Sequence, residues 1–178
     1  MKNIFYAVYA CDTDRHGLTC GTETILRLEK LVSVLQISPG IRKYALFGAG
    51  KSKNNPKYAL SVLMKGHLSH LCHRMNVETP HMVGPLRQAW GSLDESIQIR
   101  NNLRGFGIKE ITVISSSYHI PRLKVIWKLI APEIRVTFVS VKVKRKLIDY
   151  AEPAKIIWAY IKFLLYKAKI KESYLFQN

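Results

Sequence analysis

Residues 111–122 read Ile-Thr-Val-Ile-Ser-Ser-Ser-Tyr-His-Ile-Pro-Arg, a run that predicts a strand, a turn and a helix in immediate succession. The β-branched half, Ile111 to Ile114, is typical of a strand that is buried on both faces. Pro121 suits the first turn of a helix, where its fixed φ fits and its missing N–H costs nothing. A helix N-terminus behind a buried strand favours a bound anion. We therefore expect a ligand site at this turn.

Strand and helix signals alternate along the rest of the chain. Strands are predicted at Ile4 to Cys11, Lys43 to Phe47, Val77 to Val83, Ile111 to Ile114 and Ile134 to Val143. Helices are predicted from Thr22, which would cap its own helix, at Lys57 to Arg74 and Ser92 to Gly105, from Pro121 to about Ile130, and at Pro153 to Lys169. This alternation predicts one three-layer, doubly wound, Rossmann-like α/β domain over residues 1–178, with a mostly parallel five-stranded sheet.

The composition favours an anionic partner. The chain has 178 residues, 48% of them hydrophobic, which is enough for one domain with a real core. Its 28 Lys and Arg exceed its 12 Asp and Glu, for a formal net charge of +16. Nucleic acid, lipid headgroups and a phosphorylated small molecule are the partners that such a charge indicates. A cation-rich, solvated surface without a dedicated partner explains the charge equally well.

Cysteine use and hydropathy indicate a cytoplasmic location. Cys11, Cys20 and Cys72 form no CxxC pair, which fits a reducing compartment. The apolar run at the beginning of the chain is too short for a signal peptide and is interpreted as the first strand. No apolar stretch approaches the ~20 residues of a membrane span. Peripheral association with the inner membrane is the alternative.

A glycine-rich turn follows the second predicted strand. The run Phe47-Gly48-Ala49-Gly50-Lys51-Ser52 resembles a P-loop, but Ala45 stands where that pattern needs glycine. Pro56 would also interrupt the helix that a P-loop requires. We expect instead a turn in which Gly48 and Gly50 let the backbone approach a ligand.

Ser92-Leu93-Asp94-Glu95 has the spacing of a capping box, with Ser92 at the N-cap and Glu95 at the third helical position. That interpretation leaves Asp94 unexplained. A carboxylate, an imidazole and a guanidinium at one cleft could perform acid–base chemistry or bind a polar ligand. We expect Arg122 and the amides of Ser115, Ser116 and Ser117 to hold an anion. His119 is the acid–base candidate, and Asp94 would orient His119 or a ligand hydroxyl.

Two further clusters have a structural interpretation. His67, His70 and His73, with Cys72 and His81, suggest a metal site, but steps of three residues spread side chains around a helix. We expect solvated histidines and no metal. The last helix is basic, aromatic and amphipathic, which is also typical of a helix on an anionic membrane. We favour a helix that covers the sheet, with its lysines facing water.

The run from Ile114 to Arg122 resembles the Val-Thr-Ser-x-Tyr-His-Met-x-Arg motif of the SanA/ElyC/YdcF family, bacterial proteins built on a domain of unknown function. The turn at Phe47–Gly50 is similar to the family's Ser-Gly-Gly turn. Ser92–Glu95 is similar to its Thr-x-Glu-Asn motif, with Asp94 in place of the glutamate. The resemblance covers most of the chain, and it adds Tyr118 to the ligand-binding candidates.

The resemblance implies a Rossmann-like fold, a link to cell-envelope metabolism and, for the YdcF-like branch, binding of S-adenosylmethionine. The leading hypothesis is a small-molecule-binding α/β protein, an enzyme of the YdcF-like type acting on a nucleotide-like or phosphorylated ligand. The alternative is a protein that binds nucleic acid, or a membrane surface, through its basic surface. No nucleic-acid reading motif is recognised in the sequence.

Overall fold

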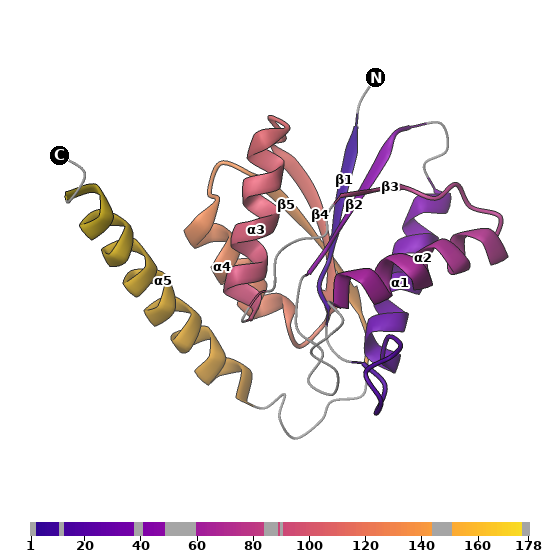
Figure 1. The fold of residues 1–178 in the computed structure, drawn as a ribbon, viewed down its shortest axis with the longest axis horizontal. Helices are drawn as coiled ribbons and strands as arrows, with labels where there is room; N and C mark the ends of the chain where they lie inside the picture. The colour runs from indigo at the N-terminus through magenta and orange to yellow at the C-terminus, as the bar shows by residue number, and fades with distance from the viewer. Residues whose placement is uncertain are drawn as a thin grey trace.

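The computed structural model describes residues 3–10, 13–37, 41–48, 60–83, 89, 91–143 and 151–175. Its centre is a sheet in which every pair of neighbouring strands is parallel. The strands are β1 (Ile4–Val8), β2 (Lys43–Phe47), β3 (His81–Val83), β4 (Glu110–Ser116) and β5 (Arg135–Val141), in the order β3-β2-β1-β4-β5 (Figure 1). The predicted parallel five-stranded sheet is confirmed.

Helices cover both faces of this sheet. They are α1 (Thr22–Gln36), α2 (Leu60–Arg74), α3 (Ser92–Gly105), α4 (Ile120–Ile130) and α5 (Glu152–Leu175). One apolar cluster joins the sheet to α1 and α2, and a second joins it to α3, α4 and the first half of α5. Figure 1 shows α5 outside α3 and α4, with the C-terminal end of this helix far from the sheet. The arrangement is the predicted three-layer, doubly wound α/β fold.

The central strand β1 explains why both faces need a cover. Phe5 and Ala7 pack in the cluster with α3 and α4, whereas Tyr6 and Val8 pack in the cluster with α1 and α2. Successive side chains of a strand point to opposite faces. A strand whose whole run is apolar is therefore stable only between two helical layers.

The predicted capping of two helices is wrong, although both helices begin at the predicted residues. The N-caps of α1 and α3 are Gly21 and Gly91, and neither helix has a side-chain capping hydrogen bond. Thr22 and Ser92 are the first helical residues instead. The hydroxyl of Ser92 is bonded to His119 and Arg122, and the carboxylate of Glu95 is buried against Gly48, so neither group forms the expected capping box.

Other boundaries moved by a few residues. β1 ends at Val8, and α5 extends to Leu175. The predicted glycine turn beyond Gly48, with Gly50, and the basic run at 144–146 lie outside the described residues. Among the described residues no helix has both the length and the hydropathy that crossing a membrane requires.

Gly48 marks a close approach between β2 and α3. Its N–H donates to the Val8 carbonyl over 2.9 Å. A Cβ at this position would lie 3.0 Å from the carboxyl carbon of Glu95 and 3.1 Å from the backbone nitrogen of Ala10. No side chain fits there without a shift, so glycine lets the end of the strand and the buried carboxylate meet.

We expect Gly48→Ala to lower the free energy of unfolding by about 1–3 kcal/mol, because the added methyl group overpacks this contact. Gly66→Ala is the matched control, since a Cβ there meets no atom within 4 Å outside its own helix. This control should raise the stability by about 0.5–1 kcal/mol, because alanine is the better helix former. Urea unfolding measures both values, and an equal response of the two variants would contradict the contact.

Candidate functional site

The strand order reverses between β1 and β4, the first strand of the chain and the fourth. In open α/β sheets, ligands bind outside the carboxyl ends of the strands at such a switch point. Tyr9 follows β1 there, and Ser115 and Ser116 end β4. The sequence therefore places its serine-rich turn at the edge where a ligand site is expected.

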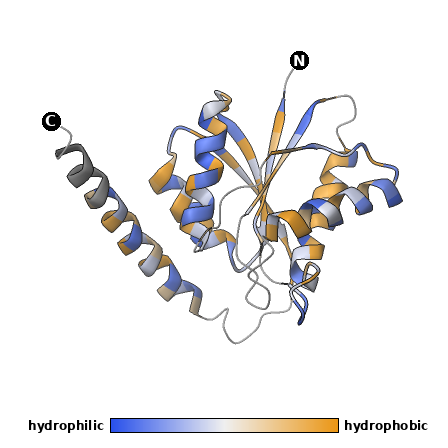
Figure 2. Ribbon diagram, viewed as in Figure 1, coloured by the Kyte–Doolittle hydropathy of each residue, from blue (hydrophilic) through white to orange (hydrophobic). Residues whose placement is uncertain are grey.

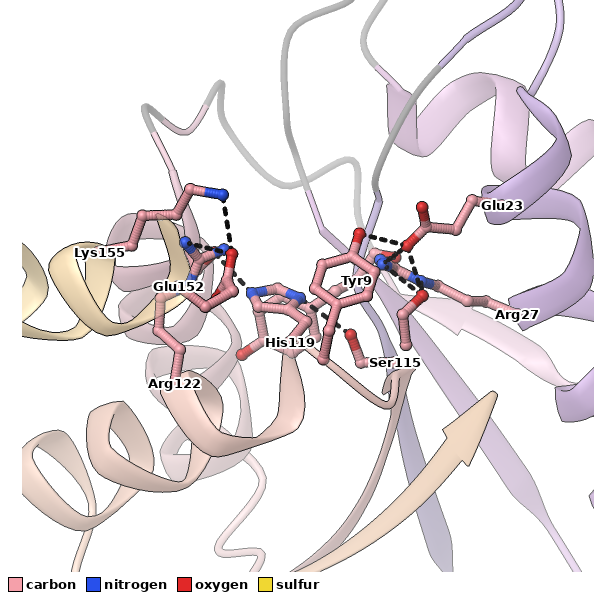
Figure 3. A network of polar contacts seen from close by, with 11 residues as sticks. Tyr9, Glu23, Arg27, Ser115, His119, Arg122, Glu152 and Lys155 are labelled. Atoms are coloured by element: carbon pink, nitrogen blue, oxygen red, sulfur yellow. Dashed lines mark hydrogen bonds and ion pairs between the residues drawn. The ribbon is translucent and has the colours of Figure 1, made fainter. Parts of the chain in front are cut away.

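A buried ion pair ties α1 to this edge (Figure 3). Arg27 is only 1% exposed, and its Nη2 contacts Oε1 of Glu23 over 2.5 Å. Its Nη1 donates to the Tyr9 carbonyl over 2.7 Å, and its Nε and Nη2 donate to the Ser116 hydroxyl. Glu23 also accepts from the hydroxyls of Ser116 and Tyr118. A buried charge is tolerated when its donors are satisfied in this way.

A chain of neutral hydrogen bonds ties α3 and α4 to β1. The Ser96 hydroxyl donates to the Ser92 carbonyl over 2.6 Å, so the Tyr9 hydroxyl, 2.5 Å away, donates to Ser96. Trp127 Nε1 donates to the Tyr9 oxygen over 3.0 Å. Burial is the main cause that raises the pKa of Tyr9 above its usual range. Tyr9 is therefore a neutral connector and not a proton donor in chemistry.

His119 lies between two serines. Its Nδ1 is 2.9 Å from the Ser115 hydroxyl, and its Nε2 is 3.0 Å from the Ser92 hydroxyl. The ring is 5% exposed. Burial, and then the positive charges of Arg122, Arg27 and Lys155, lower the pKa of His119 well below its usual 6.5. The imidazole is thus neutral, with one nitrogen donating and the other accepting.

Arg122 connects this histidine to α5. Its Nη2 donates to the Ser92 hydroxyl over 3.2 Å, and its Nη1 lies 3.4 Å from Oε1 of Glu152. Lys155 Nζ contacts the same carboxylate oxygen over 2.8 Å (Figure 3). Burial lowers the pKa of Arg122, and the charge of Glu152 opposes that shift. Two atoms, Arg122 Nε and Glu152 Oε2, are buried and have no hydrogen-bond partner among the described residues.

A pocket of about 200 Å³ opens beside Arg122, between the first turn of α3, α4 and α5. Its apolar lining includes Ile126, Trp158 and Ala159. Its polar side chains are those of Ser92, Asp94, Arg122, Lys155 and Lys162. Hydrogen-bond donors and cations thus face an accessible space that is large enough for a small ligand.

Several residues singled out in the sequence come together here. Ser92, Ser115, His119 and Arg122 form one connected set of hydrogen bonds, and Asp94 lines the same pocket as Ser92 and Arg122. Both ring nitrogens of His119 face serine hydroxyls. Two serines thus hold this ring, and the role of Asp94, which would orient His119 or a ligand hydroxyl, stays a prediction.

Other predicted residues serve the framework. Ser116 and Tyr118 donate to Glu23, and Gly48 lies against Glu95. The amide of Ser117 donates to the Val141 carbonyl over 3.0 Å. Because the carbonyl at the end of β5 already accepts from that amide, the prediction that it holds an anion is wrong. Gly50 lies outside the described residues.

The sequence analysis missed Tyr9, Glu23, Arg27, Glu152 and Lys155. A signal for two of them exists, because Glu23 and Arg27 fall at the buried positions of α1. Two opposite charges four residues apart on a core-facing stripe indicate a buried ion pair. Glu152 and Lys155 have no such signal, since only the fold brings α5 to Arg122.

Metal binding finds no support in the parts of the chain that the structure describes, where no three His, Cys, Asp or Glu side chains gather as ligands. Cys20 and Cys72 are both buried.

Comparison with known proteins identifies no family for this chain. No protein-family model and no curated protein matches this chain. A crystal structure of a protein from the universal stress protein family of Burkholderia pseudomallei aligns with 76% of this chain and 96% of its own, at 13% sequence identity and a TM-score of 0.39. A similarity this low carries no information about ligand or activity.

We expect Arg27→Met to lower the free energy of unfolding by about 3–5 kcal/mol, because it leaves the Glu23 carboxylate buried without its cation. The matched control is Arg104→Met. Arg104 pairs with Glu133 over the same 2.5 Å, but both side chains are about half exposed. The control should cost less than about 1 kcal/mol. Similar losses in urea unfolding would show that the buried pair is not a special constraint.

The depressed pKa of His119 predicts a loss of stability in acid. Below pH 6.5 the unfolded chain protonates this histidine and the folded chain does not. The free energy of unfolding should therefore fall by up to about 1.4 kcal/mol for each further pH unit. His119→Gln should reduce this slope in urea unfolding between about pH 7 and 5. An unchanged slope in the variant would contradict a neutral, buried imidazole.

Proposed function

We propose that this protein binds a small anionic ligand, phosphorylated or nucleotide-like, in the pocket between α3, α4 and α5. One observation carries the proposal: the side chains of Arg122, Lys155 and Lys162 line one pocket beside the first turn of α3. A hydrogen bond between a charged donor and a ligand oxygen contributes about 1.5–3 kcal/mol.

The charges around the pocket support an anion. Among the described residues that line the pocket, Arg122, Lys155 and Lys162 supply three cations and Asp94 one carboxylate. Glu152 and Glu95 do not line it, although their charges act on Arg122. The first turn of α3 adds the partial positive charge of a helix N-terminus. A positive excess in a partly buried site attracts anions more strongly than the same charges would in open solvent.

The chemistry of the donors favours a phosphoryl group. A planar guanidinium and neighbouring ammonium groups match phosphate oxygens. S-adenosylmethionine, the cofactor that the family resemblance implies, carries a cationic sulfonium and an ammonium against one carboxylate, so Arg122 and the lysines would repel part of it. We therefore favour a phosphorylated ligand over S-adenosylmethionine as the occupant of the pocket.

His119 and Asp94 receive separate roles in this proposal. The neutral imidazole holds the Ser92 hydroxyl in place, and Asp94 accepts a hydrogen bond from a ligand hydroxyl. A histidine whose pKa lies well below 6.5 is a poor proton donor at neutral pH, so a positioning role suits it better than acid catalysis. Ser92, His119 and Arg122 also lie in the motifs that carry the resemblance to the SanA/ElyC/YdcF family. We extend the proposal to an enzyme of that kind in envelope metabolism.

The test is a thermal-shift measurement with ADP, inorganic pyrophosphate, S-adenosylmethionine and a short single-stranded oligonucleotide. At a concentration near 100 times its dissociation constant, a bound ligand stabilises the protein by about 2.7 kcal/mol. We expect a shift with ADP or pyrophosphate that persists at about 0.3 M salt. Arg122→Gln should weaken this binding by about 10- to 100-fold, because charged hydrogen bonds are lost.

Lys128→Gln is the control, since it removes an exposed cation of the same helix that does not line this pocket. Equal weakening by Lys128→Gln would mean that overall charge, and not the pocket, binds the anion. A shift with the oligonucleotide alone, lost as salt rises, would identify a nucleic-acid-binding protein and overturn the proposal. A shift with S-adenosylmethionine alone would overturn the ligand class.

A further inference from the structure

The face of α5 that is turned away from the domain is apolar. Ile157 is 64% exposed and Leu165 is 62% exposed, and Trp158, Ile161 and Leu164 are exposed as well. More than half of the large apolar side chains that are exposed in the described part of the chain lie on this helix. Figure 2 shows hydrophobic segments recurring along α5. This finding corrects the expectation that α5 only covers the sheet with its lysines facing water.

The exposed side chains form a stripe. Ala159 and Phe163 are buried and anchor α5 on the domain. Ile157, Ile161, Leu164 and Leu165 follow one another at spacings of four, three and one residues, which places them on the opposite side of the helix. A helix that packs on one side needs only one apolar face, so its own domain does not explain the second.

Cations flank this stripe. Lys167 is exposed, and its Nζ lies 5.2 Å from the centre of the Phe163 ring, while Lys162 is half-buried. Between residues 151 and 168 the acidic residue is Glu152, and that carboxylate is buried under Arg122 and Lys155. The outer surface of this part of α5 is therefore apolar and aromatic and has no acidic group, and the cations Lys162 and Lys167 lie at its edges, toward the domain.

We propose that the outer face of α5 docks on the surface of a bilayer that contains anionic lipids. An apolar stripe flanked by lysines, with aromatic side chains at its border, matches the boundary between acyl chains and negatively charged headgroups. Among the described residues no helix could cross a membrane, so α5 would lie in the plane of the surface.

The net positive charge of the chain favours an anionic bilayer over a second copy of the chain as the partner of this face. Two copies that met through α5 would bring like cations together on molecules that each carry a formal charge of +16, whereas an anionic bilayer attracts them. The proposal does not depend on the ligand pocket. It does predict that the α5 wall of that pocket, with Lys162, lies near the headgroups.

The test is co-sedimentation of the full chain with vesicles of phosphatidylcholine alone and of phosphatidylcholine with phosphatidylglycerol. We expect binding to the second kind, weakened by salt, and a blue shift of the Trp158 fluorescence that is absent in Trp158→Phe. Ile161→Glu combined with Leu165→Glu should reduce the affinity by on the order of tenfold or more, since it places charge in the apolar stripe.

The matched control is Ile37→Glu combined with Val62→Glu, because these two apolar residues are also exposed but lie outside α5. This control should bind as the unchanged protein does, and both double variants should melt near its temperature because all four sites are exposed. Failure to bind phosphatidylglycerol vesicles, equal binding to both vesicle types, or equal losses in the two double variants would overturn the proposal. A protein that is dimeric alone, does not bind vesicles and becomes monomeric in the α5 variant would show that this face joins two copies.

Discussion

The buried guanidinium of Arg27 constrains how α1, β1 and β4 are arranged around the site. The cost of removing Arg27 from solvent is several kcal/mol unless its donors are satisfied. Its partners come from three places: the Tyr9 carbonyl after β1, the Ser116 hydroxyl at the end of β4, and Glu23 on its own helix. The reversal of strand order at β1 and β4 is thus held by charge as well as by the sheet.

The positive charge of Arg27 also affects the protonation state of the neighbouring His119. Arg27 and Arg122 lie close enough to His119 to oppose its protonation, and burial opposes it further. The neutral ring can then accept from one serine and donate to the other, which fixes the Ser92 hydroxyl beside the pocket. Donors that are positioned before a ligand arrives lose little entropy when it binds. The buried framework therefore positions the donors of the site before a ligand binds.

The sequence predicted the fold class, the five strands and the turn at Ser115–Arg122, because apolar periodicity and proline position are local properties. It also singled out Ser92, His119 and Arg122, which the structure brings into contact. It could not predict that Glu152 meets Arg122, since that contact depends on how α5 returns to the domain. The predicted capping box does not form, because the Ser92 hydroxyl bonds to His119 and Arg122 instead of to the first turn of its own helix. Likewise, the sequence predicted that an apolar face of the last helix covers the sheet, but it did not show that apolar side chains of α5 also lie on the exposed side.

The charge state of His119 is the central claim, and nitrogen NMR of a protein labelled with nitrogen-15 at histidine measures it directly. The account predicts that the two ring nitrogens of His119 stay distinct, one protonated and one not, well below pH 6.5, because burial and the surrounding cations oppose formation of the imidazolium. His119→Gln assigns the signals. Conversion of both nitrogens to the protonated form with a midpoint near pH 6.5 would contradict the account, since the ring would then be an ordinary solvated imidazole.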